Sequence, residues 1–317
     1  MVMFWVAILA VSILLYVLLD GFDLGVGMLF GLTHDETRRR EMLSAIAPMW
    51  DGNETWLVVA GVVLWGAFPV VYATLLSAFY LPVLLALAGL ILRGVAFEYR
   101  NKTERLRWIW DTGFAGGSLV AAFIQGMIVG ALVEQLPITN GQYTGDDFGW
   151  FSPFAMLCGV GLCLGYALLG ACWLVRKCEG DVREEAYRLI PYLAISLLAF
   201  LVVVFGYALA ENLRVIHRWV ERPYLFAFPA IGIVAALVAA ASVRHRPRRS
   251  AVLHGRAHFC GRVRHAGDLV LALHNPVLDH HRRSRRTPLQ SRLHVLGRGS
   301  LRLPADAALH CHQLHRL

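Results

Sequence analysis

The stretch Leu19-Asp20-Gly21-Phe22-Asp23-Leu24-Gly25 places two carboxylates at the end of an apolar run. A second stretch, Ala47-Pro48-Met49-Trp50-Asp51-Gly52-Asn53-Glu54, places two more at the start of the next apolar run. An unpaired charge within a bilayer costs several kcal/mol, so acids in such positions normally mark an ion or proton path. The two stretches together predict a membrane protein whose carboxylates matter for its function.

Composition and hydropathy agree with a membrane location. Hydrophobic residues fill 57% of the 317 positions and the mean hydropathy is +0.54, more than a soluble core of this size requires. Runs long enough to cross a hydrocarbon layer of about 30 Å as helices lie near residues 4–30, 55–76, 77–97, 112–134, 154–175, 189–210 and 224–243. The predicted fold is an all-α, polytopic transmembrane helix bundle with about seven spans, the second and third closely joined around Pro69.

Basic residues in the loops predict the orientation. They follow the first, third and fifth spans: Arg38, Arg39 and Arg40; Arg100, Lys102, Arg105 and Arg107; Arg176, Lys177, Arg183 and Arg188. The positive-inside rule makes this shared side cytoplasmic and places the N-terminus outside. The 135–153 loop contains Asp146 and Asp147 but no Lys or Arg, which fits the outer side. The loop with Arg214, Arg218 and Arg222 is the exception.

The sequence changes character at residue 244. The predicted transmembrane domain, residues 1–243, contains 15 basic and 19 acidic residues. Residues 244–317 contain 15 Arg, 11 His and three acids, with no Lys, Glu, Ile, Met, Tyr or Trp. As written, this tail is a candidate polybasic arm or His-rich metal tract.

A shifted reading frame is the favoured explanation of the tail. With permitted codon choices, the frame one base along from Asn275 to Arg316 encodes a long apolar span. An apolar span within an Arg- and His-rich tract favours a frameshift near residues 240–250 over a real basic arm. We therefore expect residues 244–317 to be out of frame, and we infer no nucleic-acid partner from their charge.

The acids of the first two spans predict a packed polar seam. Asp20 and Asp23 are three residues apart, so they share one helix face, and the glycines around them permit close helix approach. Asp51, Asn53 and Glu54 stand where the second span begins on the cytoplasmic side, shortly before Trp56.

A further charged group ends the third span at the same membrane face. It consists of Glu98 with Arg93 and Arg100. Carboxylates that run from the cytoplasmic face into the apolar zone could relay protons, because each can alternate between charged and neutral forms. For each residue taken singly, the alternative is an interfacial cap or a structural salt bridge.

Redox ligands are scarce in the body of the chain. His34 and His217 are its two histidines, both in predicted loops, so no imidazole is expected within the bilayer to hold a haem or copper. Met28, Met127 and Met156 are more typical of packing than of axial ligation. The four cysteines around the fifth span form no C-x-x-C pair, so we interpret them as packing residues rather than a metal or disulfide set. They are Cys158, Cys163, Cys172 and Cys178.

Three motifs resemble subunit II of cytochrome bd-type quinol oxidases, close to the short, cyanide-insensitive branch. They are Asp20-Gly21-Phe22-Asp23, the segment from Ala47-Pro48 to Trp56, and Arg93-Gly94-Val95-Ala96-Phe97-Glu98-Tyr99-Arg100. Their order and spacing match, and the resemblance covers about residues 1–243. The family has nine spans in this subunit, so the chain as written would lack the final two, and the shifted-frame string resembles the last of them.

The resemblance implies a division of labour between two subunits. In this family, subunit I carries the haems, oxidises quinol and reduces dioxygen to water with cytoplasmic protons. Subunit II is haem-free, stabilises the complex, contributes to a proton path and can hold a structural quinone. By motif, Asp51 and Trp56 would lie near the entrance of that path and Glu98 deeper in, while Asp20 and Asp23 would serve packing or subunit contact. The family often has Asp at the position of Glu98 and His at that of Met49.

The predicted function is therefore that of a haem-free subunit of a membrane quinol:oxygen oxidoreductase. We expect a multi-pass protein of the cell (inner) membrane, with subunit I, quinone and lipid as partners, no catalytic residue and no metal of its own; a small third subunit stays open. One alternative is a proton-coupled secondary transporter, although the sequence lacks a clear internal repeat and paired broken helices. Another is a membrane scaffold whose acids are purely structural.

Overall fold

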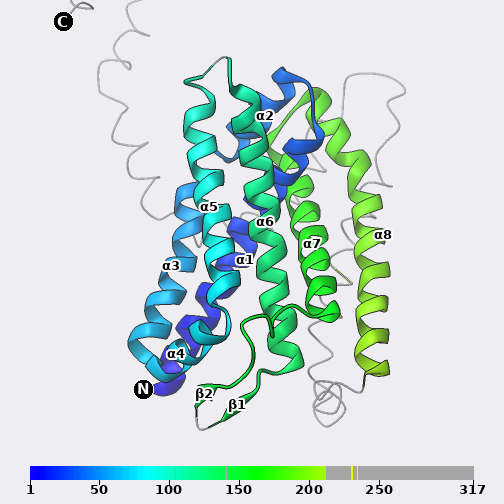
Figure 1. The fold of residues 1–317 in the computed structure, drawn as a ribbon. Coiled ribbons are helices and arrows are strands. Elements are labelled where there is room, and N and C mark those ends of the chain that lie inside the picture. Colours follow the sequence, from blue (N-terminus) through cyan, green and yellow to red (C-terminus); the bar gives the residue numbers. More distant parts are fainter. Residues whose placement is uncertain (104, 140, 212–229, 231–233, 235–317) are drawn as a thin grey trace, which may run out of the picture. The chain divides into compact units, whose positions relative to one another are not determined.

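The computed structural model describes residues 1–103, 105–139, 141–211, 230 and 234. They form a helix bundle with one short hairpin (Figure 1). The elements are α1 (Val2–Leu32), α2 (Glu36–Ile46), α3 (Trp50–Ala67), α4 (Pro69–Ala78), α5 (Tyr80–Arg100), α6 (Arg107–Glu134), β1 (Ile138–Thr139), β2 (Gln142–Tyr143), α7 (Pro153–Lys177) and α8 (Gly180–Ala210). The predicted all-α class is confirmed.

The membrane-spanning helices match the first six predicted spans. Helices α1, α5, α6, α7 and α8 are each long and apolar enough to cross a bilayer, and α3 with α4 makes a sixth crossing if the bent pair is one span. The predicted seventh span, residues 224–243, and the tail, residues 244–317, lie outside the described residues.

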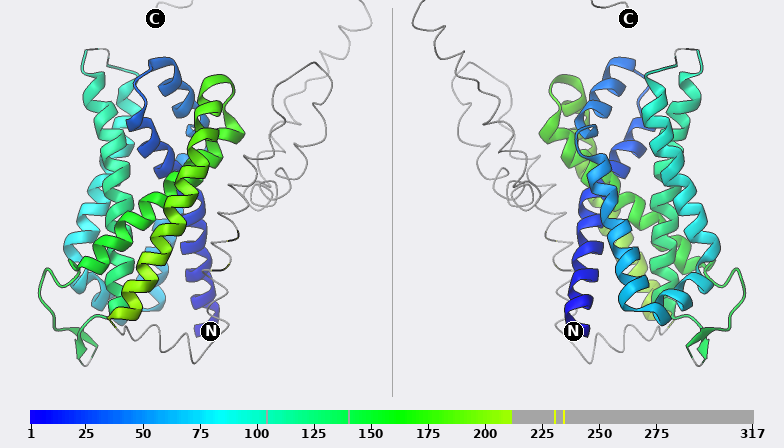
Figure 2. Two further views of the ribbon diagram at one scale, coloured as in Figure 1. Left: turned by 90° about the vertical axis from the view of Figure 1, so that its right-hand side faces the viewer. Right: turned by 90° about the vertical axis from the view of Figure 1, so that its left-hand side faces the viewer.

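Helix α1 packs against α3, α6 and α7 (Figure 2). Its C-terminal half, which contains the LDGFDLG stretch, is buried, whereas much of its N-terminal half is exposed. Gly25 faces the backbone of Gly170 and the carbonyl of Tyr166 on α7, where a Cβ atom would collide with the backbone. Glycine at this crossing lets the two helices approach closely enough for their backbones to touch.

The second predicted span is broken rather than continuous. The prediction of one helix over residues 55–76 is wrong in this respect, because α3 ends at Ala67 and α4 begins at Pro69 with a bend of 120°. Phe68 between them is non-helical, with φ −135° and ψ 57°. Proline supplies no N–H to continue α3 and disfavours the helical conformation of the residue before it.

Two of the predicted basic loops contain helix. Arg38, Arg39 and Arg40 lie in α2, where the Asp35 side chain caps the helix by accepting a hydrogen bond from the Arg38 N–H at 2.9 Å. Arg183 and Arg188 lie in the first turns of α8, which starts nine residues before the predicted apolar run at 189. An apolar-run criterion finds only the part of a helix that contacts lipid, so polar extensions are missed.

The three basic segments meet at one end of the bundle, which we call the basic end. It contains α2, the α5–α6 connection and the α7–α8 connection (Figure 1). Arg38 of α2 bonds to Asp181 and Glu185 of α8, and Arg107 of α6 bonds to Glu36 of α2. The β1–β2 hairpin lies at the opposite end, where Thr74 of α4 donates a hydrogen bond to the Gly141 carbonyl at 2.6 Å.

Candidate functional site

A buried polar cluster connects α1, α3 and α5 inside the bundle. We define it as Asp20, Asp23, Asn53, Glu54 and Arg93. Its strongest contact is the ion pair from Arg93 Nη1 to Asp20 Oδ1 at 2.9 Å, with side chains 2% and 0% exposed. Desolvating two such charges is expensive, so the pair is stable only because each group neutralises the other.

Asp23 bonds to a neutral partner instead. Asn53 Nδ2 donates to Asp23 Oδ2 at 2.8 Å and lies 3.4 Å from the Leu19 carbonyl. Glu54 stands at the edge of the cluster, 29% exposed, with Oε2 3.9 Å from Arg93 Nη2. Asp20 and Asp23 therefore occupy the same helix face but have different electrostatic partners.

Four polar atoms of the cluster have no hydrogen-bond partner among the described residues. They are Asp20 Oδ2, Asp23 Oδ1, Asn53 Oδ1 and Arg93 Nη2, all buried. Buried polar groups are normally satisfied, so we expect a bound proton or an ordered water to satisfy these atoms.

Polar side chains of α6 and α7 extend this region. Gln125 Nε2 donates to Tyr16 Oη at 2.7 Å, and Tyr166 Oη lies 3.4 Å from Gln125 Oε1. Tyr16 is one turn before Asp20 on α1, and the Tyr166 ring lies against Gly21. Uncharged hydroxyl and amide groups of α1, α6 and α7 therefore lie near the charged groups of the cluster.

A second charged network holds the basic end together. Arg100 is 1% exposed; its Nη2 lies 2.7 Å from Glu36 Oε2, and its Nε donates to Asp111 Oδ1. Arg39 Nη1 bonds to Asp111 Oδ2 at 2.7 Å, and Arg107 Nη1 to Glu36 Oε1 at 3.1 Å. This network fixes α2 against the ends of α5 and α6.

The aromatic ring of Phe30 on α1 packs against two arginines of this network. The guanidinium carbons of Arg39 and Arg100 lie 4.9 Å and 5.3 Å from the centre of its ring. Burial tends to raise the pKa of Glu36, but hydrogen bonds from Arg100 and Arg40 outweigh it and hold that pKa below its usual value. The ionised carboxylate is therefore part of the native structure of this end.

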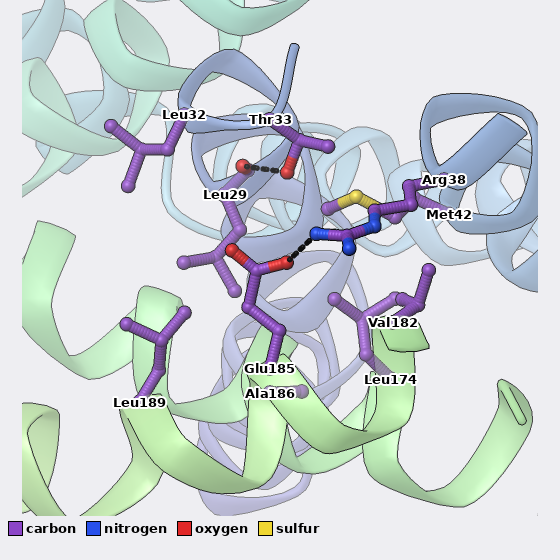
Figure 3. Close-up of a pocket in the computed structure, with 10 residues that line it drawn as sticks. All are labelled: Leu29, Leu32, Thr33, Arg38, Met42, Leu174, Val182, Glu185, Ala186 and Leu189. Carbon is purple, nitrogen blue, oxygen red and sulfur yellow. Dashed lines mark hydrogen bonds and ion pairs between the residues drawn. The ribbon is translucent and has the colours of Figure 1, made fainter. Parts of the chain in front are cut away.

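A separate pocket lies between α1, α2, α7 and α8 at the basic end (Figure 3). Its walls are mainly apolar, and Arg38 and Glu185, which form an ion pair at 2.9 Å, are among the residues that line it. None of the residues in the buried polar cluster lines it.

The predicted site residues fall into two groups. The structure brings Asp20, Asp23, Asn53, Glu54 and Arg93 together in the buried polar cluster, and places Arg100 in the network of the basic end. Asp51 and Glu98 are exposed on the surface of this chain, and Trp56 is partly buried with its indole nitrogen enclosed and unpartnered among the described residues.

Sequence reasoning missed several members of these networks. Tyr16, Gln125 and Tyr166 lie inside predicted spans, and Glu36 and Asp111 flank them. A single glutamine or tyrosine in an apolar run is a weak signal, because either is frequent in packed helices. Arg93 and Arg100 were the better indicators of these networks, because a buried guanidinium needs an acidic partner.

No group of three or more His, Cys, Asp or Glu side chains suited to a metal ion occurs within the described part of the chain. The four cysteines there are free thiols. Burial, with Glu41 nearby, raises the pKa of the Cys178 thiol to about 12, so this thiol is unreactive at neutral pH.

The fold and the buried charges define a multi-pass helical membrane protein with a polar seam between its spans. The family model of cytochrome bd terminal oxidase subunit II matches residues 1–266. The chain is 34% identical over 276 residues to cytochrome bd-I ubiquinol oxidase subunit 2 of Escherichia coli strain K12, covering 76% of this chain and 72% of the relative. It is 33% identical over 204 residues to cytochrome bd ubiquinol oxidase subunit 2 of Bacillus subtilis strain 168, covering 62% and 60%.

The chain therefore belongs to the cytochrome bd terminal oxidase subunit II family. It is a subunit of a quinol oxidase, an oxidoreductase of the cell membrane, and its partner is subunit I. The predicted family is confirmed, whereas membership of the cyanide-insensitive branch stays a prediction.

Proposed function

We propose that this chain is the haem-free subunit of a bd-type terminal oxidase. It supports assembly of the complex and carries part of a proton path from the cytoplasm to the oxygen site in subunit I. The observation that carries the proposal is the exposure of two carboxylates, Asp51 and Glu98, on neighbouring helices at the basic end.

The described spans lack histidine, the commonest haem ligand. Haem iron is usually held by His, Cys, Met or Tyr, with histidine the commonest. His34 is the single histidine in the described residues, and it lies in the connection between α1 and α2 rather than in a span. The described cysteines are buried or partly buried beside packed helices. We therefore assign the haems to the partner subunit.

The basic end is assigned to the cytoplasm. Three basic segments gather there and contact one another, whereas residues 108–175, which include the hairpin at the other end, contain no Lys or Arg. This asymmetry is what the positive-inside rule describes. Labelling a cysteine introduced at Asp146 tests the assignment: reaction from outside intact cells supports it, and reaction only after permeabilisation overturns it.

Asp51 is suited to the entrance of a proton path, and Glu98, which the family motif would place deeper in, is exposed as well. Asp51 lies in the first turn of α3 and Glu98 near the end of α5, and their neighbours Trp50 and Phe97 pack with ring centres 5.0 Å apart. The two acids thus stand at one end of the bundle on helices that meet. Exposed acids of a membrane helix are stable when another protein subunit or water covers them, because lipid solvates charge poorly.

Trp56 contributes a polar atom five residues further along α3 than Asp51. Its Nε1 is enclosed and has no partner among the described residues, while its ring packs against the core that contains α1. An indole N–H in such a position can donate to a water molecule in a chain of waters. We propose that it helps to order that chain.

Neutral replacements of the two exposed acids test the path. We expect Asp51→Asn and Glu98→Gln, each in the complex with subunit I, to reduce oxygen consumption by at least roughly tenfold, since proton transfer through positioned groups contributes about 10²–10⁴-fold. Assembly and haem content should stay at the wild-type level. Asp146→Asn makes the same chemical change at the opposite end and should leave oxygen consumption unchanged.

Unchanged oxygen consumption in assembled Asp51→Asn and Glu98→Gln complexes would overturn the proton path and leave the scaffold role. The same purified complex would also be the material in which to look for the quinone, lipid and small third subunit that complete this proposal.

A further inference from the structure

The buried polar cluster contains more negative than positive groups. Asp20 and Asp23 are both 0% exposed, and Arg93 is the cation paired with the cluster among the described residues. Glu54 adds a third carboxylate at the edge. Two ionised carboxylates facing one guanidinium inside a bilayer would leave a net buried charge that costs several kcal/mol.

The contacts show which carboxylate lacks compensation. Arg93 bonds directly to Asp20, whereas the hydrogen bond to Asp23 comes from the uncharged Asn53 amide. Asp23 Oδ1 and Asp20 Oδ2 have no partners among the described residues, and both residues lie on one face of α1, three apart. A proton on Asp23 would turn a buried, unpartnered acceptor into a donor in a cluster that still contains unpartnered acceptors.

We propose that Asp20 and Asp23 bind one proton, held on Asp23, so that the cluster contains ionised Asp20, Arg93 and a neutral Asp23 that donates a hydrogen bond. Asp20 Oδ2 and Asn53 Oδ1 are the buried acceptor atoms of the cluster, besides Asp23 Oδ1 itself, that lack a hydrogen-bond partner among the described residues. The site goes beyond the proposed proton path, because it rests on buried residues that the path does not use.

The groups around the pair agree with this assignment. Tyr16 on α1 and Tyr166 on α7 are uncharged phenols, Gln125 on α6 is a neutral amide, and Arg93 on α5 is paired with Asp20. Glu54 on α3 brings negative charge, which favours a proton on its neighbour. Arg93, which pairs with Asp20 and has its Nη2 3.9 Å from Glu54 Oε2, disfavours a metal cation in the cluster, since a guanidinium repels it.

Two matched variants of the complete complex separate the carboxylates. Asn closely mimics a protonated Asp, so we expect Asp23→Asn to assemble and to melt within about 3 °C of wild type. Asp20→Asn leaves Arg93 buried without its partner, and the yield of assembled complex should fall on the order of tenfold. Adding Arg93→Gln to Asp20→Asn removes both charges and should restore most of that yield.

Infrared difference spectroscopy detects the proton directly. The wild-type minus Asp23→Asn spectrum at neutral pH should contain the carbonyl band of a protonated carboxylic acid, which shifts in deuterium oxide. The wild-type minus Asp146→Asn spectrum is the control for the same chemical change at an exposed position and should lack the carbonyl band of a protonated carboxylic acid.

Two results would overturn the proposal. One is an Asp23→Asn complex that is lost as completely as the Asp20→Asn complex. The other is an assembled Asp23→Asn complex whose difference spectrum lacks the carbonyl band of a protonated carboxylic acid. Neither readout involves oxygen consumption, so failure here is distinguishable from failure of the proton path.

Discussion

At the scale of single residues, the same side chain has different roles according to its surroundings. Asp20 is enclosed and paired with Arg93, whereas Asp51 is exposed in the first turn of α3. Burial and contacts, rather than residue type, therefore separate structural acids from candidate proton carriers.

Glu36 provides a residue-scale test outside the membrane. Its pKa is held below the ordinary value by Arg100 and Arg40, although burial opposes this. A lowered pKa means that its stabilising contribution is complete above the unfolded value and is lost as the pH falls through the folded value. The side chain is 38% exposed, so solvent screens the effect and we expect it to be modest.

We expect Glu36→Gln to loosen α2 at neutral pH, seen as faster amide hydrogen exchange over Glu36–Ile46 in the complex. Acid should loosen the same segment in wild type but add little in the variant. Glu179→Gln is the matched control, because Glu179 is exposed at the same end and uses its backbone N–H, not its side chain, to bond to Glu41. Equal exchange in the two variants would contradict the prediction.

At the scale of helices, the position of a proline decides whether a span breaks. Pro69 follows the non-helical Phe68 and divides α3 from α4, whereas Pro191 lies inside α8, which continues through it. Both prolines lack an N–H, but only at Pro69 does the preceding residue leave the helical region. The distinction depends on packing that an apolar-run analysis does not contain.

Helix crossings depend on individual glycines, and α7 supplies a matched pair. A Cβ added at Gly170 would lie 2.5 Å from the Gly25 carbonyl carbon, whereas Gly165 faces open space in this chain. We expect Gly170→Ala to destabilise the subunit by about 1–3 kcal/mol and Gly165→Ala to change stability by less than about 0.5 kcal/mol. Thermal denaturation of the purified complex measures both, and equal midpoints would show that this close approach is not required.

At the scale of the whole molecule, ion pairs join basic segments that are far apart in the sequence. Arg38 pairs with Glu185, 147 residues away, and Arg100 pairs with Glu36, 64 residues away. These contacts place the basic residues of three connections at one end. The basic end, which we propose faces the cytoplasm, is therefore held together by ion pairs between its three basic segments.

The reading frame of the C-terminal tail can be tested by sequencing the gene. We propose that residues 1–243 form the transmembrane domain and that residues 244–317 are out of frame, because the composition changes abruptly there. Resequencing the codons for residues 235–255 should reveal a missing or extra base that restores an apolar C-terminus. Confirmation of the present frame would overturn this proposal and make the Arg- and His-rich tail a real part of the protein.

The sequence by itself determined the class of the protein, its family and the ends of the bundle at which charges collect. Apolar length, loop charge and short motifs are local properties, so they can be recognised without coordinates. Only the tertiary structure decided that Arg93 pairs with Asp20, that Asn53 bonds to Asp23, and that Glu98 is exposed. These outcomes depend on which helix faces meet, and that choice is made by packing between segments distant in the chain.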